Sequence, residues 1–263
     1  PMAIDEREST WIAERAREHG VQVHLEHNLE RIEGDEGGNV KRVVTDQGSY
    51  DTDLLVVSIG VVPNTGWLEG SAIERDERSG GIVVDAGLAT SAEGVFAAGD
   101  CAAIRWFDGQ RRPEQLWYTA RDQGRVAGRR LVGMTASYDR GVWYNSAKLM
   151  DIEYTTAGFV NLELEGEQEW FYEERGEVRS TNRIVVQDGR VVGFNFLGRR
   201  WDHSVLIEWI REGRELEWVL DHLGEASFDT EFVPPLRIPS DARGQLSEPK
   251  TGSGPFAGAA LPI

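Results

Sequence analysis

Apolar residues follow two different periods along the chain, and they divide its first part into one helix and several strands. Asp5 and Glu8 form a capping pattern before apolar residues at helical spacing, and Gly20 ends the predicted helix. Strands are expected at 21–25, 29–32 and 40–45, with a turn-rich stretch at 34–38. Residues 54–59 (LLVVSI) are apolar on both faces, which predicts the buried central strand of a sheet.

Two more apolar runs and a helical pattern follow. The runs at 82–84 and 95–98 predict strands, and the second run ends directly on Gly99-Asp100. Residues 113–131 repeat apolar positions at helical spacing. The order of these elements is that of an α/β protein. Taken alone, Gly-Asp after an apolar run is also how an ordinary strand enters a turn, so both interpretations stay open at this point.

From about residue 139 the pattern changes to strands first and helices afterwards. Strands are expected at 152–160, 169–172, 183–186 and 191–196, and helices at 202–211 and 215–223. This order predicts a separate α+β domain. Beyond Pro234 the chain is rich in Pro, Gly and Ser with little periodicity, which predicts a mostly disordered tail.

Composition narrows the possible partners. The 263 residues include 45 acidic and 28 basic side chains, a formal net charge of -17, which opposes binding to nucleic acid or to an anionic membrane. Only three of the basic residues are lysines, a bias typical of an acidic proteome in a salt-rich cytoplasm or of a GC-rich genome. No run of 18 uninterrupted apolar residues occurs. We therefore expect a cytoplasmic protein without a membrane span.

Metal-binding patterns are missing from the sequence. Cys101 is the only cysteine, so no disulfide and no cysteine-based zinc site can form within the chain. The five histidines include no His-Glu-x-x-His pattern. No metal site is predicted, and Cys101 is interpreted as a packing residue more readily than as a redox group.

Three motifs give the Gly-Asp stretch a more specific interpretation. Residues 90–100 (TSAEGVFAAGD) resemble the second FAD-binding motif of the pyridine nucleotide-disulfide oxidoreductase superfamily, a threonine followed after four residues by an apolar strand and Gly-Asp. Residues 53–64 (DLLVVSIGVVPN) are similar to that superfamily's connection between its NAD(P)H-binding and FAD-binding domains. Residues 117–128 resemble the helix that follows Gly-Asp. The three motifs stand in family order.

The resemblance implies an α/β fold with partial Rossmann-like domains and an α+β interface domain. Residues 1–60 would be the remainder of the NAD(P)H-binding domain and 61–138 the C-terminal part of the FAD-binding domain. Residues 139–233 would form the interface domain, through which a homodimer is expected, and 234–263 the tail. The implied cofactor is FAD, with NAD(P)H as co-substrate and a small molecule or a redox protein as electron acceptor.

Five residues are candidates for binding the cofactor: Gly60, Gly99, Asp100, Trp117 and Lys148. Gly99 allows the backbone to approach a bulky ligand, and the resemblance assigns Asp100 to a ribityl hydroxyl. It places Trp117 beside the isoalloxazine, with core packing as the alternative. Lys148 would offset negative charge on the flavin or pair with Asp151 at the surface. No catalytic residue is identified.

The family pattern is matched only from partway through. Neither of its two Gly-x-Gly-x-x-Gly loops is present, and residues 252–258 (GSGPFAG) do not replace them, because no strand precedes them and Pro255 interrupts them. We therefore expect a fragment that binds FAD poorly by itself. The predicted function of the whole protein is hydride transfer from NAD(P)H to FAD. The alternative is a non-catalytic remnant that serves as a dimerisation or partner-binding module.

Overall fold

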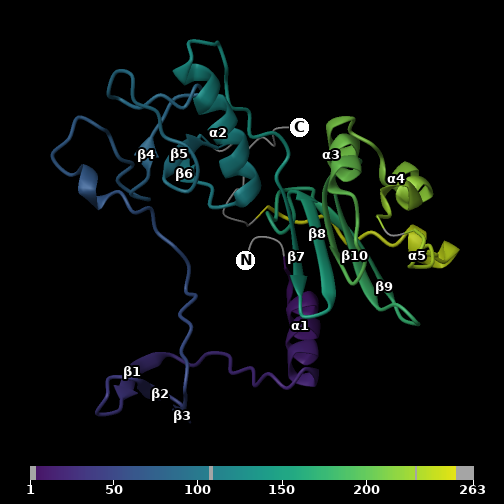
Figure 1. Ribbon diagram of the computed structural model, residues 1–263. Helices are drawn as coiled ribbons and strands as arrows, with labels where there is room; N and C mark the ends of the chain where they lie inside the picture. The colour runs from purple at the N-terminus through teal and green to yellow at the C-terminus, as the bar shows by residue number, and fades with distance from the viewer. Residues whose placement is uncertain (1–3, 107–108, 229, 253–263) are drawn as a thin grey trace. The chain divides into compact units, whose positions relative to one another are not determined.

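The computed structural model of the protein describes residues 4–106, 109–228 and 230–252 (Figure 1). These residues belong to two compact units. The smaller is Ala13–Val62, and the larger combines Pro1–Ile12 with Pro63–Ile263. Among the described residues, no helix has the length and apolar character needed to cross a membrane.

The smaller unit holds an antiparallel sheet of β1 (Leu29–Gly34), β2 (Val40–Thr45) and β3 (Gly48–Asp51). The predicted strand at 21–25 does not form. The prediction of a buried strand at 54–59 is also wrong, because these residues are not in a strand and Ile59 is 92% exposed. A strand that is apolar on both faces requires neighbouring strands and a layer on each side, and the described residues supply neither.

One part of the larger unit holds a small sheet and a long helix. The sheet has the order β4 (Ile82–Val83), β5 (Ala102–Arg105) and β6 (Arg111–Pro113), and the helix is α2 (Trp117–Leu131). The helix begins later than predicted because Arg111–Pro113 belongs to β6. A short 3-10 helix, η1 (Gly66–Leu68), precedes the sheet.

The predicted strand at 95–98 is also wrong, although the segment is partly buried. It makes a single isolated bridge, between Phe96 and Ala89. The backbone N–H of Ala97 donates to the carbonyl of Leu88 at 3.1 Å, and that of Thr90 donates to Val95 at 2.9 Å. The segment therefore pairs with the preceding loop, and no strand of the described residues lies beside it as a ladder partner.

An antiparallel sheet of five strands forms the rest of the larger unit. Its order is β7-β8-β11-β10-β9. The strands are β7 (Tyr144–Leu149), β8 (Ile152–Gly158), β9 (Gln168–Glu174), β10 (Ser180–Gln187) and β11 (Arg190–Leu197). Helices α3 (His203–Arg211) and α4 (Leu216–His222) follow, then η2 (Leu223–Ala226). This is the α+β arrangement that the strand-then-helix pattern predicts.

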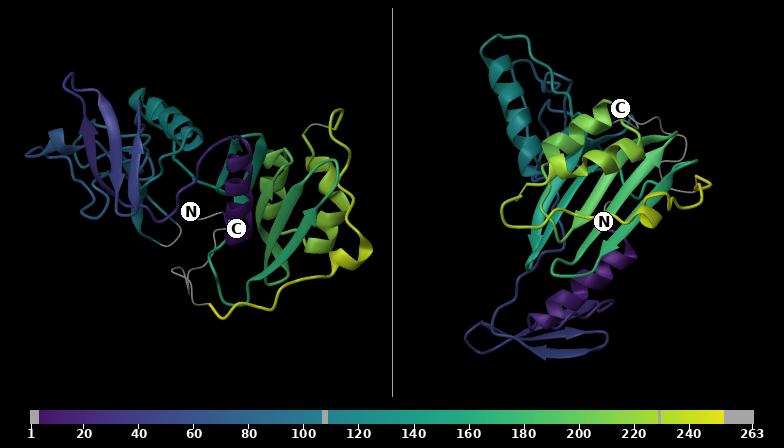
Figure 2. Two further views of the ribbon diagram at one scale, coloured as in Figure 1. Left: turned by 90° about the horizontal axis from the view of Figure 1, so that it is seen from below. Right: turned by 90° about the vertical axis from the view of Figure 1, so that its right-hand side faces the viewer.

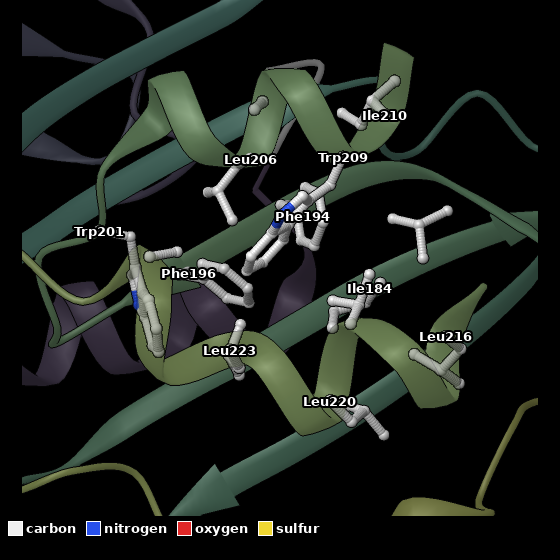
Figure 3. Packing of buried hydrophobic residues seen from close by; sticks show 14 of the residues in the cluster. Ile184, Phe194, Phe196, Trp201, Leu206, Trp209, Ile210, Leu216, Leu220 and Leu223 are labelled. Carbon is white, nitrogen blue, oxygen red and sulfur yellow. The ribbon is translucent and has the colours of Figure 1, made fainter. Parts of the chain in front are cut away.

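The two faces of this sheet are covered by different helices. Ile184, Phe194 and Phe196 pack against Leu206, Trp209 and Leu220 of α3 and α4, as Figure 3 shows. Val185 and Leu197, the chain neighbours of Ile184 and Phe196, belong to a second cluster that contains Trp11, and Val192 joins this cluster beside an irregularity in the β10–β11 register. Because neighbouring residues of a strand point to opposite faces, Trp11 lies on the face away from α3 and α4.

Trp11 belongs to α1 (Glu6–Glu18), and the part of this helix within the larger unit, up to Ile12, packs against the five-stranded sheet (Figure 2). The predicted capping box is confirmed: the Glu8 N–H donates to Asp5 Oδ1 and the Asp5 N–H donates to Glu8 Oε2, each at 2.9 Å. Gly198 makes room for the indole, since a Cβ there would lie 2.9 Å from the Trp11 ring. The first turns of α1 therefore pack with the sheet of residues 144–197.

The described part of the predicted tail is ordered, which corrects the prediction for residues 234–252. It contains α5 (Ser240–Arg243), and Trp170 Nε1 donates to the Ala242 carbonyl at 2.8 Å. Farther on, the Ser247 N–H donates to the Glu169 carbonyl at 2.8 Å. The segment thus lies along the edge of β9, where backbone hydrogen bonds stabilise a sequence of low periodicity. Residues 253–263 lie outside the described residues.

Candidate functional site

The Gly99-Asp100 turn is fixed against the middle of α2. Gly99 has a φ of +81°, a value that favours glycine, and its N–H donates to Oε1 of the fully buried Gln123 at 2.7 Å. A Cβ at Gly99 would lie 3.5 Å from the Cβ of Ala120. The carboxylate of Asp100 is exposed. The turn therefore presents Asp100 to solvent from a backbone held by a buried side chain.

The N-terminal end of α2 carries no side-chain cap. Its N-cap residue, Leu116, has extended backbone angles and cannot accept a capping hydrogen bond, and the first turn contains no acidic residue. The last turn holds Arg129 and Arg130. The partial positive charge of the first turn is therefore not compensated by a carboxylate on the helix itself, which suits an anionic group of a ligand.

Trp117, the first residue of α2, lies mostly in solvent. Its side chain is 70% exposed, so the core-packing alternative does not hold within the described chain. The Arg121 guanidinium carbon lies 5.3 Å from the ring centroid of Trp117, and Tyr118 contacts the same ring edge-on at 5.5 Å. An exposed indole on an uncapped helix end is a surface on which a planar ligand can stack.

Tyr118 connects this helix end to the five-stranded sheet. Its hydroxyl lies 3.1 Å from Ser146 Oγ on β7, and its ring lies 5.0 Å from Tyr144. Tyr144 stacks on His203, with centroids 4.6 Å apart and planes at 12°. Tyr118, Tyr144 and His203 were not predicted as site residues from the sequence, because their contacts join distant segments and leave no periodic signal.

Lys148 lies two residues beyond Ser146 on the same strand. Its side chain is 61% exposed, and Nζ lies 3.2 Å from Glu153 Oε1 on β8. This carboxylate was not among the predicted partners, which were a flavin and Asp151. The site thus brings Gly99, Asp100 and Trp117 together through α2, and it connects Lys148 to them only through Tyr118 and β7.

Gly60, the fifth predicted residue, belongs to the smaller unit. It has a φ of +99°, and a Cβ at this position would meet no atom within 4 Å. The positive φ by itself explains why a glycine follows the 54–59 run, so a ligand is not needed to explain it.

A buried ion pair fixes the segment that leads into α2. Glu114 Oε1 lies 2.9 Å from Arg140 Nη2, and both side chains are almost completely buried. Burial raises the pKa of the Glu114 carboxyl above its usual range, although the Arg140 guanidinium acts in the opposite direction. Arg140 also lies over the ring of Trp106, 4.2 Å from its centroid. The pair joins the β6–α2 connection to the segment that precedes β7.

The sequence is similar to a family of known proteins. Residues 2–124 match the family model described as pyridine nucleotide-disulphide oxidoreductase. The ferredoxin reductase subunit of the 5,5'-dehydrodivanillate O-demethylase of a Sphingobium species is 31% identical over 198 residues, which cover 74% of this chain and 46% of that protein. Over residues 2–124 the chain is similar to the pyridine nucleotide-disulfide oxidoreductase superfamily.

Other known proteins resemble it over different lengths. An NADH oxidase of Streptococcus pneumoniae is 37% identical over 101 residues, 38% of this chain and 21% of that protein. The solved structure of an FAD-dependent pyridine nucleotide-disulphide oxidoreductase from Desulfovibrio vulgaris superposes with a TM-score of 0.70 at 26% identity, covering 88% of this chain and 59% of that one. The chain spans about half the length of the ferredoxin reductase subunit that it matches.

The described residues fit one end of the superfamily's FAD. The exposed indole of Trp117 and the uncapped end of α2 suit an isoalloxazine ring, and the exposed carboxylate of Asp100 suits a ribityl hydroxyl. The pyrophosphate requires a glycine-rich loop between a strand and a helix, and the 263-residue sequence contains none in that context. Most of the rejected stretch 252–258 lies outside the described residues. The described residues therefore fit the isoalloxazine and ribityl end of FAD by their chemistry, and the pyrophosphate has no matching loop in this sequence.

Proposed function

We propose that this chain forms the flavin-facing part of an FAD-dependent NAD(P)H oxidoreductase. In the whole protein, FAD supplies the chemistry by accepting hydride from NAD(P)H and passing electrons to an acceptor. The observation that carries the proposal is the hydrogen bond from Gly99 N–H to buried Gln123, which fixes Asp100 beside α2. Similarity to the superfamily supports the same conclusion.

The chain's own residues would bind and orient the cofactor. Asp100 is an acceptor for a hydroxyl hydrogen bond, and its neighbouring glycine keeps that approach free of a side chain. The first turn of α2 would stabilise negative charge on the pyrimidine side of the reduced ring. Trp117 would cover part of the ring and limit its contact with water.

The relatives support a redox protein as the electron acceptor. The match to a ferredoxin reductase subunit extends over 198 residues, whereas the match to an NADH oxidase extends over 101. The 198-residue match is longer than residues 1–138, which precede the predicted interface domain. It therefore includes part of that domain. We therefore rank an iron–sulfur protein above oxygen as acceptor.

Flavin reduction in the full-length protein that contains this chain tests the proposal. We expect a yellow protein whose absorbance near 450 nm is bleached by NADH or NADPH, and we expect Asp100→Ala to weaken FAD retention. Asp241→Ala, which removes an exposed carboxylate on α5, is the matched control and should retain FAD. A colourless full-length protein would refute the oxidoreductase and favour the non-catalytic alternative.

The homodimer is a separate part of the proposal. The five-stranded sheet with α3 and α4 has its own buried core, so it can fold as an interface domain. Sedimentation of the purified protein should give a dimer mass over a range of concentrations. A monomer that is independent of concentration would contradict this part and leave the flavin chemistry untouched.

A further inference from the structure

A cavity of about 320 Å³ lies between α4, η2 and the segment after residue 230, on the side of the sheet away from α1. That volume is within the range of small-molecule sites and exceeds what one or two buried waters fill. Nothing in the proposed oxidoreductase uses it. Its walls therefore need to be considered as a binding site in their own right.

Most of the wall is apolar. The apolar lining residues are Trp201, Leu220, Leu223, Val233, Pro235, Leu236 and Ile238. Trp201, Leu220 and Leu223 belong to the packed cluster of α3 and α4 (Figure 3), so one wall is part of the rigid core. A ligand of this cavity needs an apolar body to contact these side chains.

The polar groups of the wall are mostly hydrogen-bond donors. Ser227 and Thr230 contribute hydroxyls, and Arg243 contributes a guanidinium with five N–H groups. Asp221, the one acid among the described lining residues, is already 2.8 Å from Arg243 Nη1. One carboxylate does not use all the donors of a guanidinium. The cavity therefore offers donors to an acceptor-rich head group, and a carboxylate can accept two parallel hydrogen bonds from a guanidinium.

The outer wall is anchored at both ends, so the cavity is a defined feature of the fold. At one end, Arg199 Nη1 donates to the Pro234 carbonyl at 2.6 Å, while Arg199 itself is held by two hydrogen bonds of 2.7 Å to Glu174. At the other end, Trp170 donates to the Ala242 carbonyl at 2.8 Å. Both anchoring side chains are buried.

We propose that this cavity binds a small carboxylate with an apolar body, with the carboxylate at Arg243 and the apolar body against Leu220, Leu223 and Ile238. An alkyl acid and a planar aromatic acid share this chemistry. The site is independent of the flavin-facing residues, so the proposal does not depend on the proposed function.

Calorimetric titration of the 263-residue chain at fixed ionic strength provides the test, with octanoate and 2-naphthoate as probes and octylammonium as the probe of opposite charge. We expect saturable binding of at least one acid and none of octylammonium. The acid that binds identifies an alkyl or an aromatic body. Absence of saturable binding of both acids up to about 10 mM, which corresponds to less than about 3 kcal/mol of binding free energy, would overturn the proposal.

Three variants locate the binding. Arg243→Gln removes the proposed partner and should weaken acid binding about tenfold, as expected for a lost charge-assisted hydrogen bond. Arg237→Gln removes an exposed arginine of the same segment that does not line the cavity, and it should bind like the unchanged chain. Val233→Trp enlarges a half-buried wall residue and should abolish binding. Equal affinity in the Arg243 and Arg237 variants, or unchanged affinity in Val233→Trp, would contradict the site.

Discussion

The carboxylate of Glu8 and the guanidinium of Arg183 lie 2.9 Å apart, and both side chains are completely buried between α1 and the five-stranded sheet. Asn195 also donates to this carboxylate, at 2.7 Å, and Arg183 extends to Glu169 at 3.4 Å. The first turn of α1 is thus held on the sheet by a charge network with several partners. Removing the Glu8 charge takes away the carboxylate nearest to the buried Arg183 guanidinium and leaves the more distant Glu169.

We expect Glu8→Gln to lower the free energy of unfolding by about 3–5 kcal/mol, because Arg183 would keep its charge inside the protein. Glu6→Gln, an exposed change in the same turn, should alter it by less than about 0.5 kcal/mol. Urea unfolding followed by circular dichroism measures both. Equal stability of the two variants would show that the pair contributes little.

Gln123→Leu tests the link between α2 and the Gly99-Asp100 turn. The substitution keeps the approximate volume but leaves the buried N–H of Gly99 without its acceptor, which should cost about 1–3 kcal/mol of stability. Gln22→Leu, at an exposed position, is the control. In the full-length protein, Gln123→Leu should also weaken FAD retention. If Gln123→Leu retained as much FAD as the unchanged protein, the Gly99-Asp100 turn would not contribute to flavin binding.

Trp117→Ala should affect the cofactor without affecting the fold. The side chain is 70% exposed, so the free energy of unfolding of the chain should change by less than about 0.5 kcal/mol. Trp209→Ala, which empties a position in the core of α3, should cost about 3–5 kcal/mol. In the full-length protein, Trp117→Ala should change the flavin fluorescence. An unchanged flavin spectrum would place Trp117 away from the ring.

Acidification should destabilise the chain through His203. Burial lowers the pKa of the His203 imidazole below its usual value of about 6.5, although Asp202 acts in the opposite direction. The unfolded chain therefore binds the proton at a higher pH than the folded chain, and stability falls as the pH is lowered through about 6.5. Urea midpoints at about pH 8 and pH 5.5 measure this loss.

His203→Phe retains a ring that can stack on Tyr144 but cannot be protonated, so its loss of stability over the same pH interval should be smaller. His24→Phe, at an exposed position, should behave like the unchanged chain. If all three proteins lose the same stability, another group is responsible for the acid sensitivity.

The elements that the sequence predicts best are those with local signals. The capping box of Asp5 and Glu8, strand β2 and helices α3 and α4 all form at or near the predicted positions. Each depends on residues a few positions apart. The candidate residues Gly99, Asp100 and Trp117 also come from short motifs, and the structure gathers them around α2. Their role in FAD binding stays a prediction.

Contacts between distant segments explain what the sequence could not predict. The apolar runs 54–59 and 95–98 have the composition of strands. A strand forms only beside a hydrogen-bonded neighbouring strand, and the described residues provide no such neighbour for either run. Glu8 and Arg183 are 175 positions apart, and Tyr118 and Ser146 are 28 apart. Such pairs form when α1 and α2 pack on the sheet, and they produce no periodic pattern in the sequence.

The segment that runs along β9 also determines how the sheet meets other chains. An edge strand presents unpaired N–H and C=O groups and is a site of aggregation when it stays open. Residues 246–251 occupy part of that edge through backbone hydrogen bonds to Glu167 and Glu169. They therefore hinder the addition of a strand from another chain there. The opposite edge, β7, is the strand that contacts α2 through Tyr118. A further strand that added to β7 would therefore lie beside the residues proposed to face the flavin.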